Sequence, residues 1–278
     1  MFGAVLVFFG QFFSEVSTSL EKVIFAKEKV SYRFFGFIHS FTGAMMFAVL
    51  AIIGGHALTL SLASLPTFGI RMFLEILQFE ASIRAGARAD RTTFGAIRVI
   101  TIPLLLCIDI FLGYILTPLQ IFGMLVTMLA LGIYFFGEKF KKDGALLALF
   151  TAINAAFLVS LFKYDTTYYN PIAVEQYFIF IGLLIYFSIN VAREWWRKTL
   201  VMPPLRKLSA DLISTNVASG LVSFAYSYGP ASLILSFIRS SSVFWSFVSG
   251  MTYFGEAKTL RKILCCVLLV VAIMLMLI

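Results

Sequence analysis

Apolar segments alternate with short polar joints along almost the whole chain, and each segment is long enough to cross a bilayer as a helix. A hydrocarbon core of about 30 Å requires roughly 20 apolar residues in an α-helix. The pattern therefore predicts an all-α polytopic membrane protein with ten transmembrane helices. They are expected at 2–25, 34–54, 66–86, 92–112, 117–136, 144–163, 174–192, 208–227, 230–254 and 259–278.

The composition excludes several classes of protein. Of the 278 residues, 60% are hydrophobic and 13% are charged, whereas a soluble domain carries about 25% charged residues. This excludes soluble enzymes, nucleic-acid-binding modules and secreted disulfide scaffolds. Cys107, Cys265 and Cys266 lie in apolar runs without the spacing of a metal or disulfide site.

The basic residues are concentrated in every second joint. They follow the first, third, fifth, seventh and ninth predicted helices, at Lys22, Lys27, Lys29, Arg33, Arg84, Arg88, Arg91, Lys139, Lys141, Lys142, Arg193, Arg197, Lys198, Arg206, Lys207, Lys258, Arg261 and Lys262. The opposite joints and both termini hold at most Arg71 and Lys163, and Arg98 and Arg239 fall inside predicted helices. Because cytoplasmic loops are enriched in Lys and Arg, we expect a multi-pass protein of the plasma membrane with both termini outside the cytoplasm and no nucleic-acid partner.

The two halves of the chain resemble each other weakly. Segment 92–123 aligns with 230–264, which places Arg98 on Arg239 and Thr117 on Thr259. Five helices per half is an odd number, so the second copy enters the membrane upside down. Inverted repeats of this kind are typical of secondary transporters, whose site lies between the copies. We therefore expect one five-helix repeat at 1–138 and a second at 139–278.

Polar side chains follow helical spacing on five of the predicted helices, 2–25, 66–86, 92–112, 208–227 and 230–254. In a membrane protein such a stripe faces other helices or a water-filled cavity. The candidate residues for substrate binding and translocation are Gln11, Glu15, Glu75, Gln78, Arg98, Asn216, Ser223, Tyr226, Ser236, Arg239 and Ser246. The alternative is that individual side chains only join helices by hydrogen bonds.

Arg239 falls near the middle of predicted helix 230–254, and Arg98 falls in predicted helix 92–112. An unpaired arginine at this depth costs at least roughly 2.5–3.5 kcal/mol. Two interpretations remain open. Either the arginines are neutralised by Glu15, Glu75, Asp109 or Asp211, or they bind a carboxylate or phosphate of a substrate, which suits the guanidinium group.

Glu15 and Glu75 are the candidates for coupling to H⁺ or Na⁺, since a carboxylate in a partly dry cavity can alternate between protonated and ion-paired forms. His39 is a lone histidine in an apolar helix and is interpreted as a satisfied core residue. The chain has no ATP-binding motif and no metal-ligand spacing, so neither a cofactor nor a metal is expected.

The C-terminal segment 228–277 resembles the closing half-repeat of the drug/metabolite transporter superfamily, EamA-like branch. In that half the matching residues are Pro230-Ala231-Ser232, Phe254-Gly255-Glu256 and Thr259. In the first half they are Arg33-Phe34, Pro103, Gly113 and Thr117-Pro118-Leu119-Gln120. The resemblance implies ten helices in two inverted repeats and transport of small metabolites. The chain departs from this pattern at Tyr114 and Arg239, and in the predicted orientation of its termini.

The function hypothesis is a secondary transporter, a monomer or homodimer in the lipid bilayer. It would move a small polar or anionic metabolite, such as an amino acid, by alternating access. The alternatives are a non-transporting membrane scaffold subunit and an intramembrane lipid-modifying enzyme. Such an enzyme usually needs clustered His, Asp or Glu, and the two histidines are scattered along the sequence.

Overall fold

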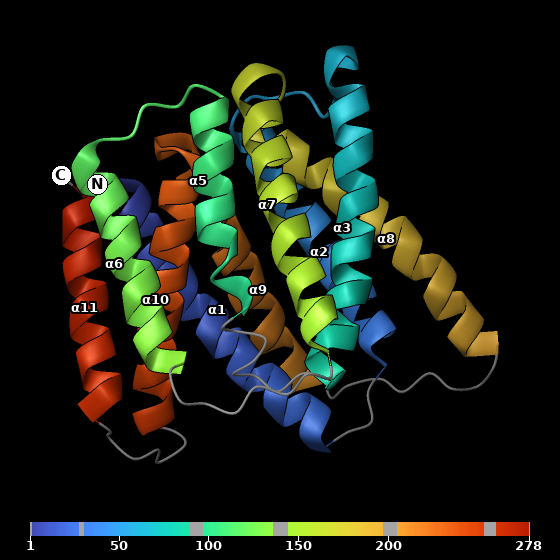
Figure 1. Ribbon diagram of the computed structural model, residues 1–278. Helices are drawn as coiled ribbons and strands as arrows, with labels where there is room; N and C mark the ends of the chain where they lie inside the picture. The colour runs from blue at the N-terminus through green and yellow to red at the C-terminus, as the bar shows by residue number, and fades with distance from the viewer. Residues whose placement is uncertain are drawn as a thin grey trace.

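A computed structural model describes residues 2–27, 31–88, 97–135, 144–196, 205–252 and 260–277. These residues form α-helices and two short 3₁₀ turns, with no strand among them. The helices are α1 (Phe2–Lys27), α2 (Tyr32–Ile53), α3 (Leu65–Arg88), α5 (Thr101–Phe111), α6 (Pro118–Phe135), α7 (Ala145–Tyr168), α8 (Ile172–Trp196), α9 (Leu205–Ala225), α10 (Ala231–Thr252) and α11 (Leu260–Leu277) (Figure 1). The turns are η1 (Leu62–Ser64) and η2 (Tyr226–Tyr228).

The chain is an all-helical membrane protein. Among the described residues, six helices are long and apolar enough to cross a bilayer: α1, α2, α6, α7, α8 and α10. The outward faces of the bundle are apolar, as a lipid-facing surface requires; Leu146 is 79% exposed and Phe157 is 53% exposed. Helices α3 and α9 fall outside the set of six because they are the least hydrophobic of the described helices, and α5 and α11 because their apolar stretches are shorter.

Consecutive helices run in opposite directions through the molecule (Figure 1). Phe2 and Leu277 lie at the same end of the bundle, which we call the terminal end. The last turns of α3 and α8 lie at the opposite end, with Arg84 and Arg193, and we call this the basic end. Helix α8 leans away from the bundle toward the basic end.

The main helix pairs connect segments far apart in the sequence. Helix α1 packs on α9 and α10, and α7 packs on α3 and α5. Helix α2 packs on α8, α6 on α11, and α5 on α10. The contact of α6 with α11 is close because Gly123 has no side chain: a Cβ there would lie 2.9 Å from the carbonyl oxygen of Ala272.

Helix α5 begins at a break in the chain, where a continuous helix was expected over 92–112. Residues 97 and 98 are helical, Val99 and Ile100 form a turn, and α5 starts at Thr101. Pro103 explains the break: it has no N–H, and in a continuous helix its ring would clash with the carbonyl of Val99. That carbonyl instead accepts a hydrogen bond from the N–H of Ile102, at 3.0 Å. Arg98 therefore lies next to a discontinuity of the backbone.

Several sequence features lie outside the described residues. They are Phe254-Gly255-Glu256 and Thr259 of the family resemblance, the boundary between 138 and 139, and the basic residues Lys29, Arg91, Lys139, Lys141, Lys142, Arg197, Lys198 and Lys258.

Candidate functional site

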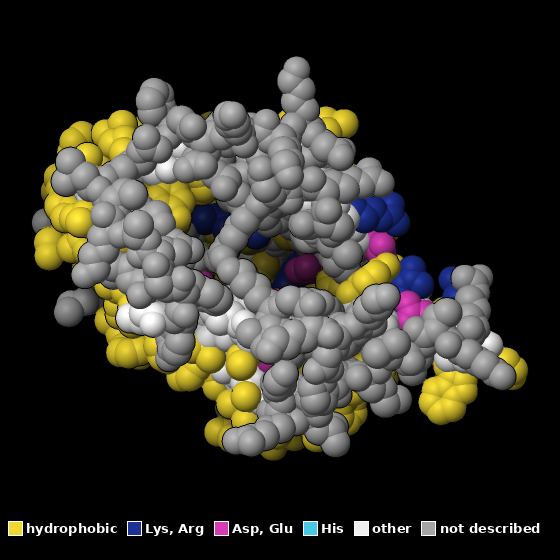
Figure 2. All heavy atoms as spheres, turned by 90° about the horizontal axis from the view of Figure 1, so that it is seen from below, with side chains coloured by type: hydrophobic (Ala, Val, Ile, Leu, Met, Phe, Trp, Pro, Cys, Tyr) yellow, Lys and Arg dark blue, Asp and Glu magenta, His cyan; other side chains and the backbone are white. Residues whose placement is uncertain are grey.

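The bundle is hollowed at its basic end. Figure 2 looks into this hollow from below and shows Lys or Arg side chains beside Asp or Glu side chains in its interior. A residue that lines this hollow should lie deep within the protein and still be partly exposed. Glu75 meets both conditions, since it is deeply placed and its side chain is 26% exposed. We call this feature the central hollow. It is the candidate functional site.

Two arginines approach each other inside the bundle. Arg239 lies in the middle of α10 and Arg98 just before α5, and both are deeply placed but partly exposed. The charge of Arg98 acts on Arg239, as does the phenol of Tyr226, which is only 5% exposed. Within the described part of the chain, Arg239 forms no ion pair with a carboxylate, and its buried Nε has no hydrogen-bond partner.

Glu15 accepts hydrogen bonds from two serines of α10. The hydroxyl of Ser246 donates to its Oε2 at 2.8 Å, and the hydroxyl of Ser249 donates to its Oε1 at 2.6 Å. The polar stripe of α10 thus meets the polar stripe of α1, and two predicted site residues, Glu15 and Ser246, are brought together.

The other three carboxylates considered as partners are also engaged. Glu75 lies 3.8 Å from Arg71, one turn earlier on α3. Asp109, which is 1% exposed, accepts a hydrogen bond from the backbone N–H of Ser232 at 2.7 Å, near the start of α10. A carboxylate is favourable there because the N-terminus of a helix carries partial positive charge. Asp211 accepts hydrogen bonds from α1 and α2 that are described below.

Gln78 is held by a residue that sequence reasoning missed. The amide nitrogen of Asn154, on α7, donates to the side-chain oxygen of Gln78 at 2.8 Å and to the carbonyl of Leu74 at 3.0 Å. Asn154 lies in an apolar run of the sequence, and its polarity alone was the signal that could have found it. Helix α7 therefore adds to the five helices expected to line the site.

A second polar region is buried toward the terminal end of the bundle. Arg71 is 2% exposed, Glu175 is fully buried, and the Nη1 of Arg71 donates to the Oε1 of Glu175 at 2.7 Å. Asn170 donates to the other oxygen of Glu175 at 2.8 Å and to Ser64 at 2.8 Å. We call these residues, with the Gln176 that accepts from Arg71, the Arg71–Glu175 network.

An aromatic chain separates the Arg71–Glu175 network from Arg239. The guanidinium of Arg71 lies 4.6 Å from the ring centroid of Phe162, a favourable cation–π distance. Phe162 in turn packs edge-on against Tyr226, with 5.6 Å between ring centroids. Tyr226, a predicted site residue, therefore lies between the Arg71–Glu175 network and the arginines of the central hollow.

Four other predicted site residues form hydrogen bonds with groups other than the arginines or are buried. Asn216 donates to Thr42 of α2 at 2.9 Å, and Ser223 accepts from Gln176 of α8 at 2.9 Å. The hydroxyl of Ser236 donates to the carbonyl of Ser232 in its own helix at 2.8 Å. Gln11 is 9% exposed. For Asn216, Ser223 and Ser236 these bonds match the alternative interpretation, in which polar side chains join or brace helices.

Glu175 and Asn170 were not anticipated. The sequence offered a signal, since Glu175 closely follows Asn170-Pro171 at the start of a helix, in a joint without excess basic residues. An acidic residue in the first turn is common on any helix, so only the position of Arg71 opposite it reveals the pair.

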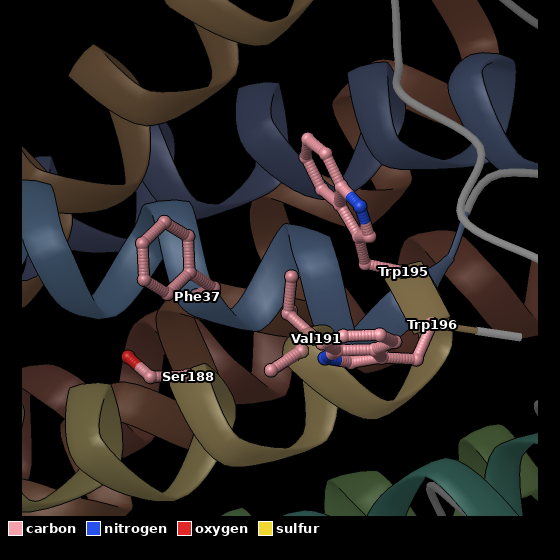
Figure 3. A pocket seen from close by; sticks show the side chains of 6 residues that line it. Phe37, Ser188, Val191, Trp195 and Trp196 are labelled. Carbon is pink, nitrogen blue, oxygen red and sulfur yellow. The ribbon is translucent and has the colours of Figure 1, made fainter. Parts of the chain in front are cut away.

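An apolar groove lies outside the bundle near the basic end. It has a volume of about 410 Å³ and is lined by Phe37 of α2 and by Val191, Trp195 and Trp196 of α8 (Figure 3). Trp195 is 67% exposed and Trp196 is 86% exposed. Aromatic residues at the end of a membrane helix are typical of the bilayer interface, so the groove is distinct from the central hollow.

The fold recurs in other proteins. A solved structure described only as "Crystal structure of protein" is similar over 98% of this chain and 94% of its own, with a TM-score of 0.73 and 12% sequence identity. In all, 27 solved chains match. No family model matches the sequence, and no curated protein does. The similarity shows a shared fold.

Proposed function

We propose that the chain is a secondary transporter that carries a small anionic or polar metabolite by alternating access. The observation that carries this proposal is Arg239. It lies deep in an apolar bundle beside a second arginine and forms no ion pair with any carboxylate of the described residues. A guanidinium group in such a position is compensated by water and by an anion that enters from the hollow.

The four carboxylates that could have neutralised the arginines support this proposal by their positions. Glu15, Asp109 and Asp211 have hydrogen-bond donors of their own, and Glu75 lies beside Arg71. Arg239 therefore retains positive charge for a ligand. The discontinuous backbone before α5 adds to this argument, because transporters bind substrates where broken helices line a cavity.

The packing of the helices supports two inverted repeats of five. In two such repeats the equivalent helices are α1 and α7, α2 and α8, α3 and α9, α5 and α10, and α6 and α11. When each helix is exchanged for its equivalent, an observed contact should become another observed contact. The contact α1–α9 becomes α7–α3, α1–α10 becomes α7–α5, and α2–α9 becomes α8–α3, and all of these are present. It leaves the pairs α2–α8, α6–α11 and α5–α10 unchanged. The smaller contacts of α10 with α11, α6 and α7, and of α7 with α8, have no counterpart of this kind among the described residues. Ten spans in the drug/metabolite transporter arrangement account for this pattern.

The two ends of the bundle fit one state of an alternating-access cycle. The central hollow opens at the basic end (Figure 2), and the Arg71–Glu175 network fills the interior toward the terminal end. Separation of Arg71 from Glu175 together with closure at the basic end would expose the arginines to the other side. A ligand can shift the equilibrium between two conformations only if its affinity for them differs. We therefore take binding of the anion at Arg239 as the event that shifts the protein between its two states.

We place the basic end in the cytoplasm, by the positive-inside rule, and the chain in the plasma membrane. Both termini then face away from the cytoplasm. A topology reporter fused after Ile278 is expected to report an extracytoplasmic location. A cytoplasmic signal would reverse the orientation, although it would leave the central hollow and its arginines unchanged.

The experiment for the transport site is thermal unfolding of detergent-purified protein with ligand panels. Succinate represents carboxylates, glycerol phosphate represents phosphates, alanine represents zwitterions and choline represents cations. A ligand at 100 times its Kd stabilises by about 2.7 kcal/mol, which raises Tm by about 5 °C in a protein of this size. We expect an anion to stabilise the native protein and to lose this effect in Arg239→Met.

The matched control is Arg84→Met, since the side chain of Arg84 is 65% exposed and pairs with Glu80 of its own helix. This variant should keep the response to anions. A response that survives in Arg239→Met would make Arg239 a structural residue and would contradict the anion site. If none of the four classes of ligand stabilises the native protein, the non-transporting scaffold becomes the better explanation.

A further inference from the structure

Three side chains of the types that bind metal ions converge in the basic half of the bundle. They are Glu21 of α1, His39 of α2 and Asp211 of α9, and one ligand atom from each lies within 4.8 Å of the others. Nε2 of His39 lies 2.8 Å from Oδ2 of Asp211. His39 therefore has two acidic neighbours, where the sequence predicted a lone histidine.

The cluster brings two acidic side chains together with one imidazole. With both carboxylates ionised, Glu21 and Asp211 contribute two negative charges. Asp211 is fully buried. Among the described residues, no Lys or Arg forms an ion pair with either of them. Buried charges are normally paired or coordinate a metal.

The carboxylate of Asp211 is also held by outer hydrogen bonds. The hydroxyl of Ser17 donates to Oδ1 of Asp211 at 2.5 Å, and the hydroxyl of Thr215 lies 2.6 Å from that of Ser17. These contacts leave Oδ2 directed at His39, whose ring also contacts Phe35 at 4.4 Å between centroids. Outer hydrogen bonds that fix the orientation of a ligand are a regular feature of metal sites.

We propose that Glu21, His39 and Asp211 bind a divalent first-row transition metal of the Zn²⁺ class. One imidazole nitrogen and two carboxylate oxygens suit Zn²⁺, Co²⁺ or Mn²⁺ better than Mg²⁺ or Ca²⁺, which prefer oxygen ligands alone. With metal–ligand distances of roughly 2.0–2.2 Å, the cluster is large enough for one ion. The metal displaces the proton shared by His39 and Asp211, and that proton goes to solvent.

The site joins helices from both predicted halves of the chain, α1 from the first and α9 from the second. It does not depend on the proposed transport activity, because the inference follows from the donor set, its charge and its outer hydrogen bonds. Transport of an anion could fail every test without affecting it.

The test uses Co²⁺ as a spectroscopic probe on the full-length protein, purified without a histidine tag and treated with EDTA. Co²⁺ titration is followed by visible absorption, and Zn²⁺ is then added as a competitor. We expect one Co²⁺ per chain and its displacement by Zn²⁺. Zn²⁺ at 100 times its Kd should also raise Tm by about 5 °C, whereas equimolar Mg²⁺ should not.

Two histidine variants give the matched comparison, because the chain has only two histidines. His39→Gln retains an amide group that can hydrogen-bond to Asp211 but is a poor metal ligand, and it should raise the Kd for Co²⁺ at least tenfold. His56→Gln, at an exposed position after α2, should bind as the native protein does. Asp211→Asn provides a second loss of a ligand if His39→Gln is poorly folded.

Several results would overturn the metal site. One is the absence of a saturable Co²⁺ signal in the native protein, and another is an unchanged signal in His39→Gln. A signal abolished by alkylation of the exposed Cys107 would assign the metal to that thiol. A Tm that responds to pH but to neither Zn²⁺ nor Co²⁺ would make the cluster a proton site.

Discussion

Arg71 and Arg239 are two deeply placed arginines of the same apolar bundle, and their surroundings differ in one decisive respect. Arg71 has a fully buried carboxylate 2.7 Å away, a second carboxylate one turn along its helix and an aromatic ring at 4.6 Å. Arg239 has another arginine and a phenol as its electrostatic neighbours. The charge of the first arginine is paired with carboxylates, whereas the second pairs with no carboxylate of the described residues. The Nε of each lacks a hydrogen-bond partner among those residues, so the difference lies in the ion pairs.

The depth of an arginine in the bundle therefore does not by itself show whether its charge has a structural or a functional role. Both arginines lie in helices of the bundle, and the sequence gives both an apolar environment. What separates them is the set of groups that other helices bring near each guanidinium. Removing those groups one at a time tests which of them determine the role of each arginine.

The largest effect is expected from Glu175→Ala. This change leaves Arg71 buried without its main partner and leaves the amide of Asn170 without an acceptor. Breaking a buried ion pair costs about 3–5 kcal/mol, which corresponds to a fall in Tm of about 10 °C for a chain of this length. Thermal unfolding of the purified variant in detergent measures it.

Glu75→Ala is the control for that prediction, since it removes the other carboxylate beside Arg71. This side chain is 26% exposed and 3.8 Å from Arg71, so its loss should cost less than about 1 kcal/mol. If Glu175→Ala lowers the free energy of unfolding no more than Glu75→Ala does, then Arg71 can pair equally well with either carboxylate. The Arg71–Glu175 network would then not be the element that closes the terminal side.

Much of the fold could be predicted because a membrane-spanning helix is a local property of the sequence. An apolar run of about 20 residues stands out wherever it occurs, and the described helices fall at the predicted places. The break before α5 was not predicted. Pro103 stands three residues inside α5, and in membrane helices proline can be tolerated when neighbouring groups satisfy the freed backbone atoms.

The candidate site was less predictable, because its contacts join residues from distant parts of the chain. Arg239 and Glu15 stand out as charged residues in apolar runs, and the candidates Glu15 and Ser246 are joined by a hydrogen bond. The pairing of Arg71 with Glu175, 104 residues later in the chain, depends on which faces of α3 and α8 meet. His39 was interpreted as a core residue for the same reason, since nothing in the sequence places Asp211 beside it.

The smallest effect on stability is expected from Arg239→Met. Methionine keeps an unbranched apolar side chain and fills irregular space, so the cavity left behind is small. No carboxylate of the described residues loses an ion-pair partner, and the like charge of Arg98 is relieved. The free energy of unfolding without ligand should therefore change by less than about 1 kcal/mol, in either direction.

This small change would complete the contrast with Arg71, because a residue kept for structure is costly to remove and a residue kept for a ligand is not. The measurement is thermal unfolding in a buffer free of phosphate and carboxylates, since an anion bound to the native protein would raise only its Tm. A loss of more than about 2 kcal/mol under these conditions would mean that Arg239 is neutralised within the folded chain. Arg239 would then have a structural role like that of Arg71, and the proposal of an anion site would lose its main support.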